Sequence, residues 1–318
     1  MRSDQSDVYE PYFEKLEQLL IESKKQKNPA LWLYKNDARG LLFMIESLFR
    51  LHAAISPVTE VKKLHKFSKK FEDLLGEIDY YVVILALFSK NKSITKKELD
   101  YFRKNRDAFE KKLNKKLLEK DYYIPKIRSF KTLSGDFNSP GNISLLHKHI
   151  KSELAEGAAY FNRYRSGFTD MEEQVHELRR KLRWISIYAE SLRGRVVLRK
   201  DIKRYSWEKE FINQNSKKSP YNSVPPKLPL KKHIFFTDKA FFALNSCIAQ
   251  LGVIKDKGLQ IEALAKCFKK TVKPKPLNAK SKVQKILGLK ASEEKLLKEA
   301  HVLLHKFYQS YKIHTLLC

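Results

Sequence analysis

Four basic side chains gather within one short stretch of the sequence, VHELRRKLRW, residues 175–184. They are His176, Arg179, Arg180 and Arg183, at relative offsets of zero, three, four and seven. In a helix these offsets place all four residues on one face. A face of this kind attracts anions, so the stretch raises the hypothesis of a polyanion-binding surface.

The flanking residues predict the helix that this surface requires. Thr169 and Glu172 have the spacing of a Ser/Thr-x-x-Glu capping box, which begins a helix. No proline or glycine interrupts the chain from there to Gly194, and we expect a helix over about 169–200. Its apolar face consists of Leu178, Leu182, Ile185, Ala189 and Leu192. The basic residues would form the opposite, outer face. The alternative is an ordinary solvent-exposed face whose charges pair with Glu172 and Glu173.

The overall charge favours a polyanionic partner. The chain of 318 residues carries a formal net charge of +28, which is spread along its length. Such an excess predicts binding to nucleic acid, an anionic membrane or polyphosphate. Lysines outnumber arginines. Because ammonium groups act as point charges and base reading prefers bidentate arginine, this composition leans away from sequence-specific DNA recognition.

The composition predicts an all-α fold. Hydrophobic residues make up 42% of the chain, enough for a sizeable core, while only 10 glycines and 11 prolines interrupt it. Helical periodicity predicts helices at about 8–25, 30–55, 58–75, 77–90, 95–119, 144–165, 169–200, 236–251, 256–271 and 292–312. The N-terminus lacks the apolar segment of a signal peptide, and the longest apolar run, 80–88, is too short to span a bilayer.

The same order of elements occurs twice. We expect an N-terminal helical half at 8–120, a linker at 121–143 and a C-terminal half at 144–318, with a basic, proline-rich insertion at 213–232. Each half has a first helix, a helix with basic residues in its first turns, a Leu-Gly step and a lysine-rich helix. The Leu-Gly steps are Leu75-Gly76 and Leu251-Gly252. A duplicated four-helix unit explains this order.

These motifs resemble the CHAD family, the conserved-histidine α-helical domain. The family pattern is a helix that begins His-x-x-Arg with further basic residues, followed later by a Leu-Gly step and an acidic residue. In the second half, His176 and Arg179 match the pair and Arg183 matches the next basic position. Further matches are Glu190, the Leu251-Gly252 step and Asp256, whereas Ser186 replaces a basic residue.

The first half matches the family pattern less well. Arg39 matches the arginine and Leu75-Gly76 matches the step, but Asn36 stands where histidine is expected. Further departures are Phe43 and Glu46 in place of basic residues, Asp79 in place of a basic residue and Tyr80 in place of an acidic one.

The resemblance implies a fold and a ligand. The fold would be two pseudo-symmetric four-helix bundles around a basic central groove, with Arg39 beside the His176 residues across the pseudo-two-fold axis. The implied ligand is inorganic polyphosphate. Polyphosphate carries roughly one negative charge per phosphate, and neutralising these charges releases counterions.

Two further basic segments are candidates for polyanion contact. Lys62, Lys66 and Lys69 lie on one side of a predicted helix, although a solvated helix face explains them as well. The helix at 95–119 is rich in lysine and includes Lys115 and Lys116, but acidic neighbours there favour local ion pairs.

The sequence shows no motif for catalysis. It has no Gly-Lys-Ser/Thr phosphate loop, no Gly-x-Ser-x-Gly and no His-Glu-x-x-His, and its histidines and cysteines lack zinc-site spacing. We therefore expect a binding protein with no cofactor or metal, not an enzyme. The expected location is cytoplasmic, with polyphosphate granules as a candidate place within it. The alternative function is a helical nucleic-acid-binding protein, and a third is a phosphoanhydride hydrolase using a metal held by unrecognised carboxylates.

Overall fold

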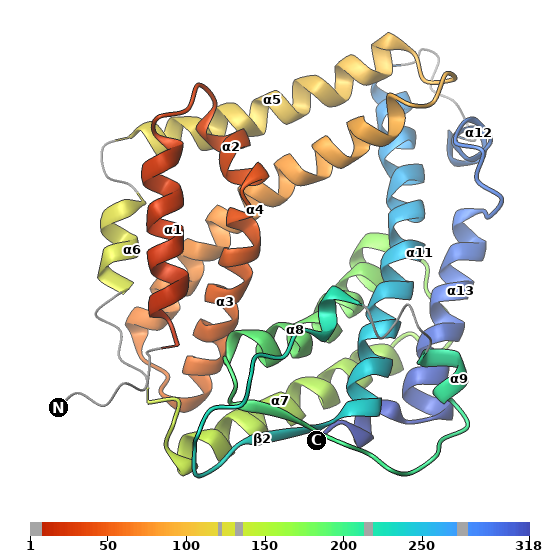
Figure 1. Cartoon of the computed structure of the whole chain (residues 1–318). Coiled ribbons are helices and arrows are strands. Elements are labelled where there is room, and N and C mark those ends of the chain that lie inside the picture. Colours follow the sequence, from red (N-terminus) through yellow and green to blue (C-terminus); the bar gives the residue numbers. More distant parts are fainter. Residues whose placement is uncertain (1–7, 120–122, 131–135, 213–218, 272–278) are drawn as a thin grey trace. The chain divides into compact units, whose positions relative to one another are not determined.

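The computed structural model describes residues 8–119, 123–130, 136–212, 219–271 and 279–318. The chain divides into two compact units, one ending at Phe137 and the other beginning at Asn138. Helices dominate both units (Figure 1), which confirms the all-α prediction. Two pseudo-symmetric bundles around a central groove remain a prediction.

The first unit is built on two long helices. Its elements are α1 (Glu10–Ser23), α2 (Pro29–Lys35), α3 (Ala38–Ile55), α4 (Thr59–Phe88), α5 (Lys96–Leu118) and α6 (Ile124–Phe130). Helix α4 packs against both α3 and α5, and α1 packs against α3 and α6 (Figure 1). Helix α6 lies within the predicted linker 121–143, and its buried Phe130 contacts Phe13 and Phe49 in the aromatic core.

Two helix boundaries in this unit differ from the prediction. The predicted helix 30–55 is broken because Asp37 adopts φ 55, in the left-handed region, and caps α3 by accepting a hydrogen bond from the Gly40 amide. The predicted break between 58–75 and 77–90 does not occur, and α4 continues through Gly76. A glycine inside a helix costs only about 1 kcal/mol, which tertiary packing can offset.

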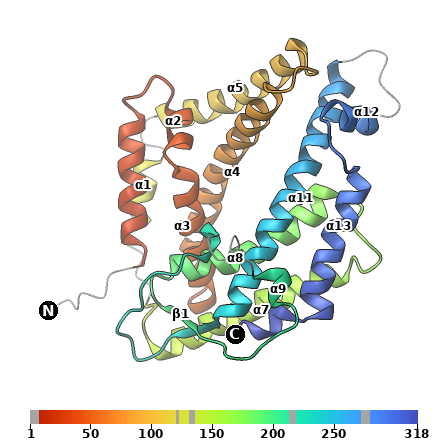
Figure 2. The ribbon, with the colours of Figure 1, turned by 45° about the vertical axis from the view of Figure 1, so that its right-hand side comes forward.

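The second unit is built around α11 (Asp238–Thr271). The other helices are α7 (Pro140–Asn162), α8 (Glu177–Ser191), α9 (Glu208–Phe211), α12 (Ala279–Ile286) and α13 (Glu293–His305), with π-helical turns η1 (Met171–His176) and η3 (Lys306–Ser310) and 3₁₀ turns η2 (Pro220–Asn222) and η4 (Ile313–Leu316). Helix α11 contacts α8, α12 and α13, and Figure 2 shows α11 and α13 side by side. As in α4, a predicted break near the Leu-Gly step is absent: the predicted helices 236–251 and 256–271 are replaced by one helix over 238–271.

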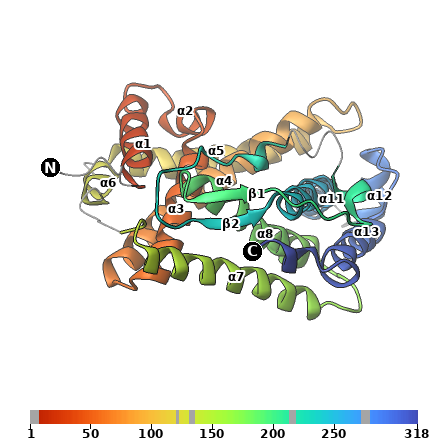
Figure 3. The ribbon, with the colours of Figure 1, turned by 60° about the horizontal axis from the view of Figure 1, so that its bottom comes forward.

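The predicted helix 169–200 begins and ends differently in the structure. Its first turn is the π-helical η1, and Asp170, not Thr169, caps it by accepting from the amide of Glu173. Helix α8 stops at Ser191 because Arg193 (φ 47) and Gly194 (φ 82) adopt left-handed conformations. Strand β1 (Val196–Arg199) follows and pairs in parallel with β2 (Ile234–Thr237), as Figure 3 shows.

The basic, proline-rich insertion is anchored to the end of α8. Residues 213–218 of this predicted segment lie outside the described residues. From Ser219 onward the chain forms η2 and then continues without regular structure to β2. The Leu228 amide donates to the Gly194 carbonyl at 3.1 Å, and a side chain at position 194 would collide with the Pro226 carbonyl. Within the described ranges, no helix is long and apolar enough to cross a membrane.

Three acidic side chains meet where α11 approaches the start of α13. Glu262 of α11 hydrogen-bonds to Glu293, which also pairs with Lys280 at 2.6 Å. Burial, followed by the negative charges of Glu293 and Asp170, raises the pKa of Glu262 to about 7. The folded protein therefore binds this proton more tightly than the unfolded chain.

We expect E262Q to stabilise the protein at about pH 8 and to have little effect at about pH 5. The protonated group contributes its full stability below the ordinary pKa of 4.5, and this contribution is lost as pH rises through about 7. Glutamine imitates the protonated form. After allowance for solvent screening we expect on the order of 1 kcal/mol, or about 2–4 °C in Tm. Thermal melts at both pH values test this, with E294Q as the control; equal or lower stability of E262Q at the higher pH would contradict it.

Candidate anion-binding site

The basic residues near His176 do not share one solvent-exposed face. We call His176, Arg179, Arg180 and Arg183 the His176 cluster. Arg179 is only 9% exposed, whereas the Arg180 side chain is 43% exposed. His176 and Arg183 are half-buried. The predicted amphipathic helix with an outer basic face was wrong here, because α8 is enclosed on several sides and its buried residues include Trp184, Ile185, Ile187 and Tyr188.

Among the described residues, the hydrogen-bond partners of Arg179 are uncharged groups. Its Nε donates to the Ile248 carbonyl of α11 at 3.0 Å, and its Nη2 donates to the Tyr221 hydroxyl at 3.0 Å. Among the described residues, no carboxylate forms an ion pair with this guanidinium. A buried charge without a counter-ion is unfavourable, and an anion that reached it would remove the imbalance.

The glycine of the second Leu-Gly step makes room for this arginine. A Cβ atom at Gly252 would lie 3.3 Å from both Nε and Nη2 of Arg179. The bonded carbonyl, that of Ile248, is one helical turn before Gly252. The structure thus brings together the two motif parts that the sequence keeps far apart. Because Gly252 has no side chain, the Arg179 guanidinium packs directly against the backbone of α11.

Two other members of the His176 cluster, His176 and Arg180, have acidic neighbours on the same helical segment. Arg180 pairs with Glu177 at 3.1 Å, and His176 lies 4.0 Å from Glu172. Burial raises the pKa of Glu172, although the charges of Lys255 and Arg180 oppose the shift. Some of the local pairing expected of an ordinary exposed face is therefore present, but not at Arg179.

Tyr221 comes from the insertion and was missed by sequence reasoning. Asn245 of α11 donates from its amide to the Tyr221 carbonyl at 2.9 Å and to the side chain of Asn222 at 2.8 Å. The hydroxyl of Ser186, on α8, hydrogen-bonds to the amide oxygen of the same Asn245. Ser186 is the position that departs from the family pattern, and here it helps to hold the turn that contacts Arg179. The sequence offered no signal for this contact.

The first unit repeats the arginine-on-glycine arrangement with different partners. Arg39 lies over Gly76, where a Cβ atom would be 3.0 Å from Nη2. Its Nε donates to Glu72 at 2.9 Å and its Nη1 to Asp79 at 2.5 Å. The guanidinium also lies 5.2 Å from the centre of the Phe43 ring. Unlike Arg179, Arg39 is paired with two carboxylates.

A lysine joins the same acidic network. Lys69 donates to Glu72 at 2.8 Å and also pairs with Asp73. Burial by itself would raise the pKa of Glu72, but the hydrogen bond from Lys69 and the charges of Arg39 and Lys69 outweigh it and lower that pKa. Burial and then the charge of Asp79 raise the pKa of Tyr34 to about 12. The positive charges of Arg39 and Lys69 are therefore largely neutralised by carboxylates of the same unit.

Lys62 and Lys66, the other predicted site residues of this unit, remain in solvent. Both lie on the exposed side of α4, about three and about two turns before Glu72 respectively. The structure thus separates the predicted Lys62, Lys66 and Lys69 group into two exposed lysines and one paired lysine.

The difference between the two arginines follows from two positions near the Leu-Gly steps. Four residues before the glycine, the first half has Glu72 and the second half Ile248. Three residues after it, the first half has Asp79 and the second half Lys255, which pairs with Asp256 at 2.6 Å. Aligning the two steps could have revealed Glu72, which sequence reasoning missed.

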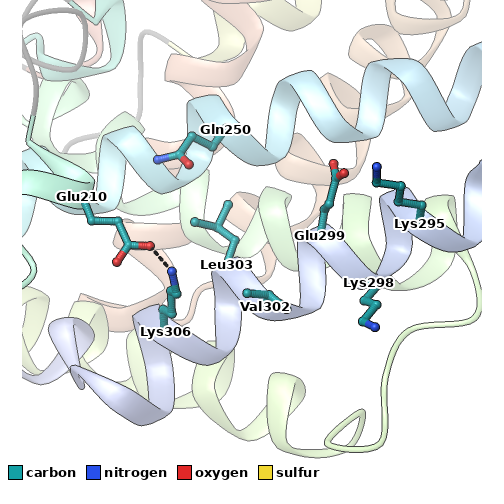
Figure 4. A pocket seen from close by; sticks show the side chains of 8 residues that line it. All are labelled: Glu210, Gln250, Lys295, Lys298, Glu299, Val302, Leu303 and Lys306. Atoms are coloured by element: carbon teal, nitrogen blue, oxygen red, sulfur yellow. Dashed lines mark hydrogen bonds and ion pairs between the residues drawn. The ribbon is translucent and has the colours of Figure 1, made fainter. Parts of the chain in front are cut away.

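The second unit also has a pocket of about 570 Å³ between α9, α11 and α13. Figure 4 shows its lining, in which Lys295, Lys298 and Lys306 alternate with Glu210 and Glu299. Lys306 pairs with Glu210 at 2.6 Å, and this hydrogen bond raises the pKa of Lys306. The pocket contains none of the predicted site residues, and its mixed charge does not favour a polyanion.

No protein-family model, curated protein or solved structure matches this chain. The resemblance to the CHAD family therefore rests on the motif residues of the sequence alone.

Proposed function

We propose that this chain binds inorganic polyphosphate and that Arg179 is the centre of its binding site. The observation that carries the proposal is the nearly buried Arg179 guanidinium, whose partners are a backbone carbonyl and a phenol. Phosphate oxygens are strong acceptors for guanidinium groups. A bound phosphate would be the counter-ion that Arg179 lacks among the described residues.

The neighbouring cations extend this site along a chain of phosphates. His176 and Arg183 lie about one helical turn before and after Arg179, and Arg180 is exposed beside them. In the first unit, exposed Lys62 and Lys66 form a separate candidate contact for polyphosphate. Arg39 and Lys69 contribute less in this proposal, because their carboxylate partners would compete with phosphate.

Polyphosphate suits this chain better than nucleic acid for two reasons. The net charge of +28 is carried mostly by lysines, which attract phosphates without reading bases. The centre of the proposed site is one guanidinium held by a backbone carbonyl and a phenol hydroxyl, an arrangement that suits phosphate oxygens, whereas single-stranded bases bind to stacked aromatic rings. We propose a binding role without catalysis, in the cytoplasm.

Competition between polyanions tests this function. We expect labelled long-chain polyphosphate to remain bound when duplex DNA is added at about tenfold excess of phosphate groups, because a thin, flexible chain can reach the nearly buried Arg179 whereas a stiff duplex meets mainly the exposed charges. Fluorescence anisotropy measures the displaced fraction. Displacement by DNA would favour the nucleic-acid alternative, and release of phosphate that depends on magnesium would favour the hydrolase.

A further inference from the structure

The Tyr221 hydroxyl can donate a hydrogen bond to a ligand. Its oxygen accepts a hydrogen bond from Arg179 Nη2 at 3.0 Å, and within the described residues no acceptor is paired with its own proton. A phenol has one proton to donate in addition to its lone pairs. Because a guanidinium bound to the oxygen polarises the hydroxyl, that proton becomes a stronger donor.

The position of Tyr221 is fixed independently of Arg179. Asn245 holds the Tyr221 carbonyl and the next side chain, and the hydroxyl of Ser219 accepts from the Tyr221 amide at 3.3 Å. The ring is only partly buried, so a ligand at Arg179 can also reach the phenol. Two hydrogen-bond donors, the charged Arg179 guanidinium and the neutral Tyr221 hydroxyl, therefore lie side by side. Hydrogen bonds from Asn245 hold the turn that contains Tyr221 against α11.

We propose that Tyr221 is a second ligand of the polyanion and that its hydroxyl and Arg179 donate to the same phosphate group. This inference rests on the proposed function and adds to it a residue from the insertion. The inserted segment then provides a specific contact as well as general positive charge. Exposed Lys227, Lys231 and Lys232 follow Tyr221 along the same segment.

The variant Y221F removes this donor while it keeps the ring. We expect about tenfold weaker binding of polyphosphate at fixed salt, as for a lost hydrogen bond to a charged group. The matched control is Y205F, which removes a hydroxyl bound to Asp201 in the same unit, and its affinity should equal that of the wild type. Melting curves of both variants confirm that each is folded at the titration temperature.

A double-mutant cycle with R179Q tests whether one phosphate is shared. If Tyr221 and Arg179 hold the same group, the double variant should lose less affinity than the product of the two single losses. Losses that multiply, or unchanged or tighter binding by Y221F, would overturn the inference and leave the proposed function intact. Wild-type protein that binds no polyphosphate would instead refute the proposed function, and this inference with it.

Discussion

Raising the salt concentration from about 50 to about 200 mM should weaken polyphosphate binding on the order of a thousandfold. The reason is counterion release: each neutralised phosphate frees a condensed cation. The entropy gained by releasing that cation becomes smaller as the bulk salt concentration rises. Arg179, Arg180 and Arg183, together with exposed Lys227, Lys231 and Lys232 of the same unit, provide about six cations, which is enough for a slope of this size. Titrations at several salt concentrations give the slope of logarithmic affinity against logarithmic salt.

A control separates the site from general attraction to a basic protein. The variant K115Q/K116Q removes one exposed and one half-buried charge from the end of α5, away from every predicted site residue in sequence. We expect it to keep most of the affinity at low salt and nearly the whole slope. An affinity of the wild type that does not change with salt would contradict electrostatic binding altogether.

Replacing the two motif arginines should change stability by different amounts. We expect R39Q to lower the free energy of unfolding by about 2–4 kcal/mol, because Asp79 loses its cation and Glu72 loses one of its two. Glu72 is 3% exposed, so water cannot replace the lost partner. Lys69 still reaches Glu72, which keeps the loss below that of a fully orphaned buried charge.

By contrast, R179Q should change the free energy of unfolding by less than about 1 kcal/mol. It removes hydrogen bonds to Ile248 and Tyr221, but it also removes a nearly buried charge that has no counter-ion. Denaturant unfolding of R39Q, R179Q and the wild type measures both effects. Equal destabilisation by the two variants would mean that Arg179 is compensated in the fold and is not held ready for an anion.

Much of the fold can be read from the sequence, because helical periodicity and sparse glycine and proline act over long segments. The prediction failed where a single residue or a tertiary contact determines whether a helix ends or continues. Asp37 breaks a helix through a left-handed backbone, and Gly76 fails to break one because packing along α4 outweighs its propensity. The pairing of β1 with β2 joins segments on either side of the insertion, which periodicity cannot detect.

The candidate site was predictable only in part, and for a similar reason. The His-x-x-Arg spacing of His176 and Arg179 and the Leu-Gly step identify Arg179 and Gly252 as motif residues. In the structure the Arg179 guanidinium lies against Gly252. Whether an arginine faces solvent, a carboxylate or a carbonyl depends on the partner helix. That partner is Glu72 in one half and the Ile248 backbone in the other, and a pattern within a single helix contains neither.

Titration of R179Q and R39Q with polyphosphate of defined length, at one low salt concentration where both variants are folded, tests the central claim most directly. The account predicts that R179Q loses affinity by at least about tenfold, as expected for a lost charged hydrogen bond, while R39Q stays within about twofold of the wild type. Unchanged binding by R179Q, or a larger loss in R39Q than in R179Q, would contradict the assignment of Arg179 as the centre of the site.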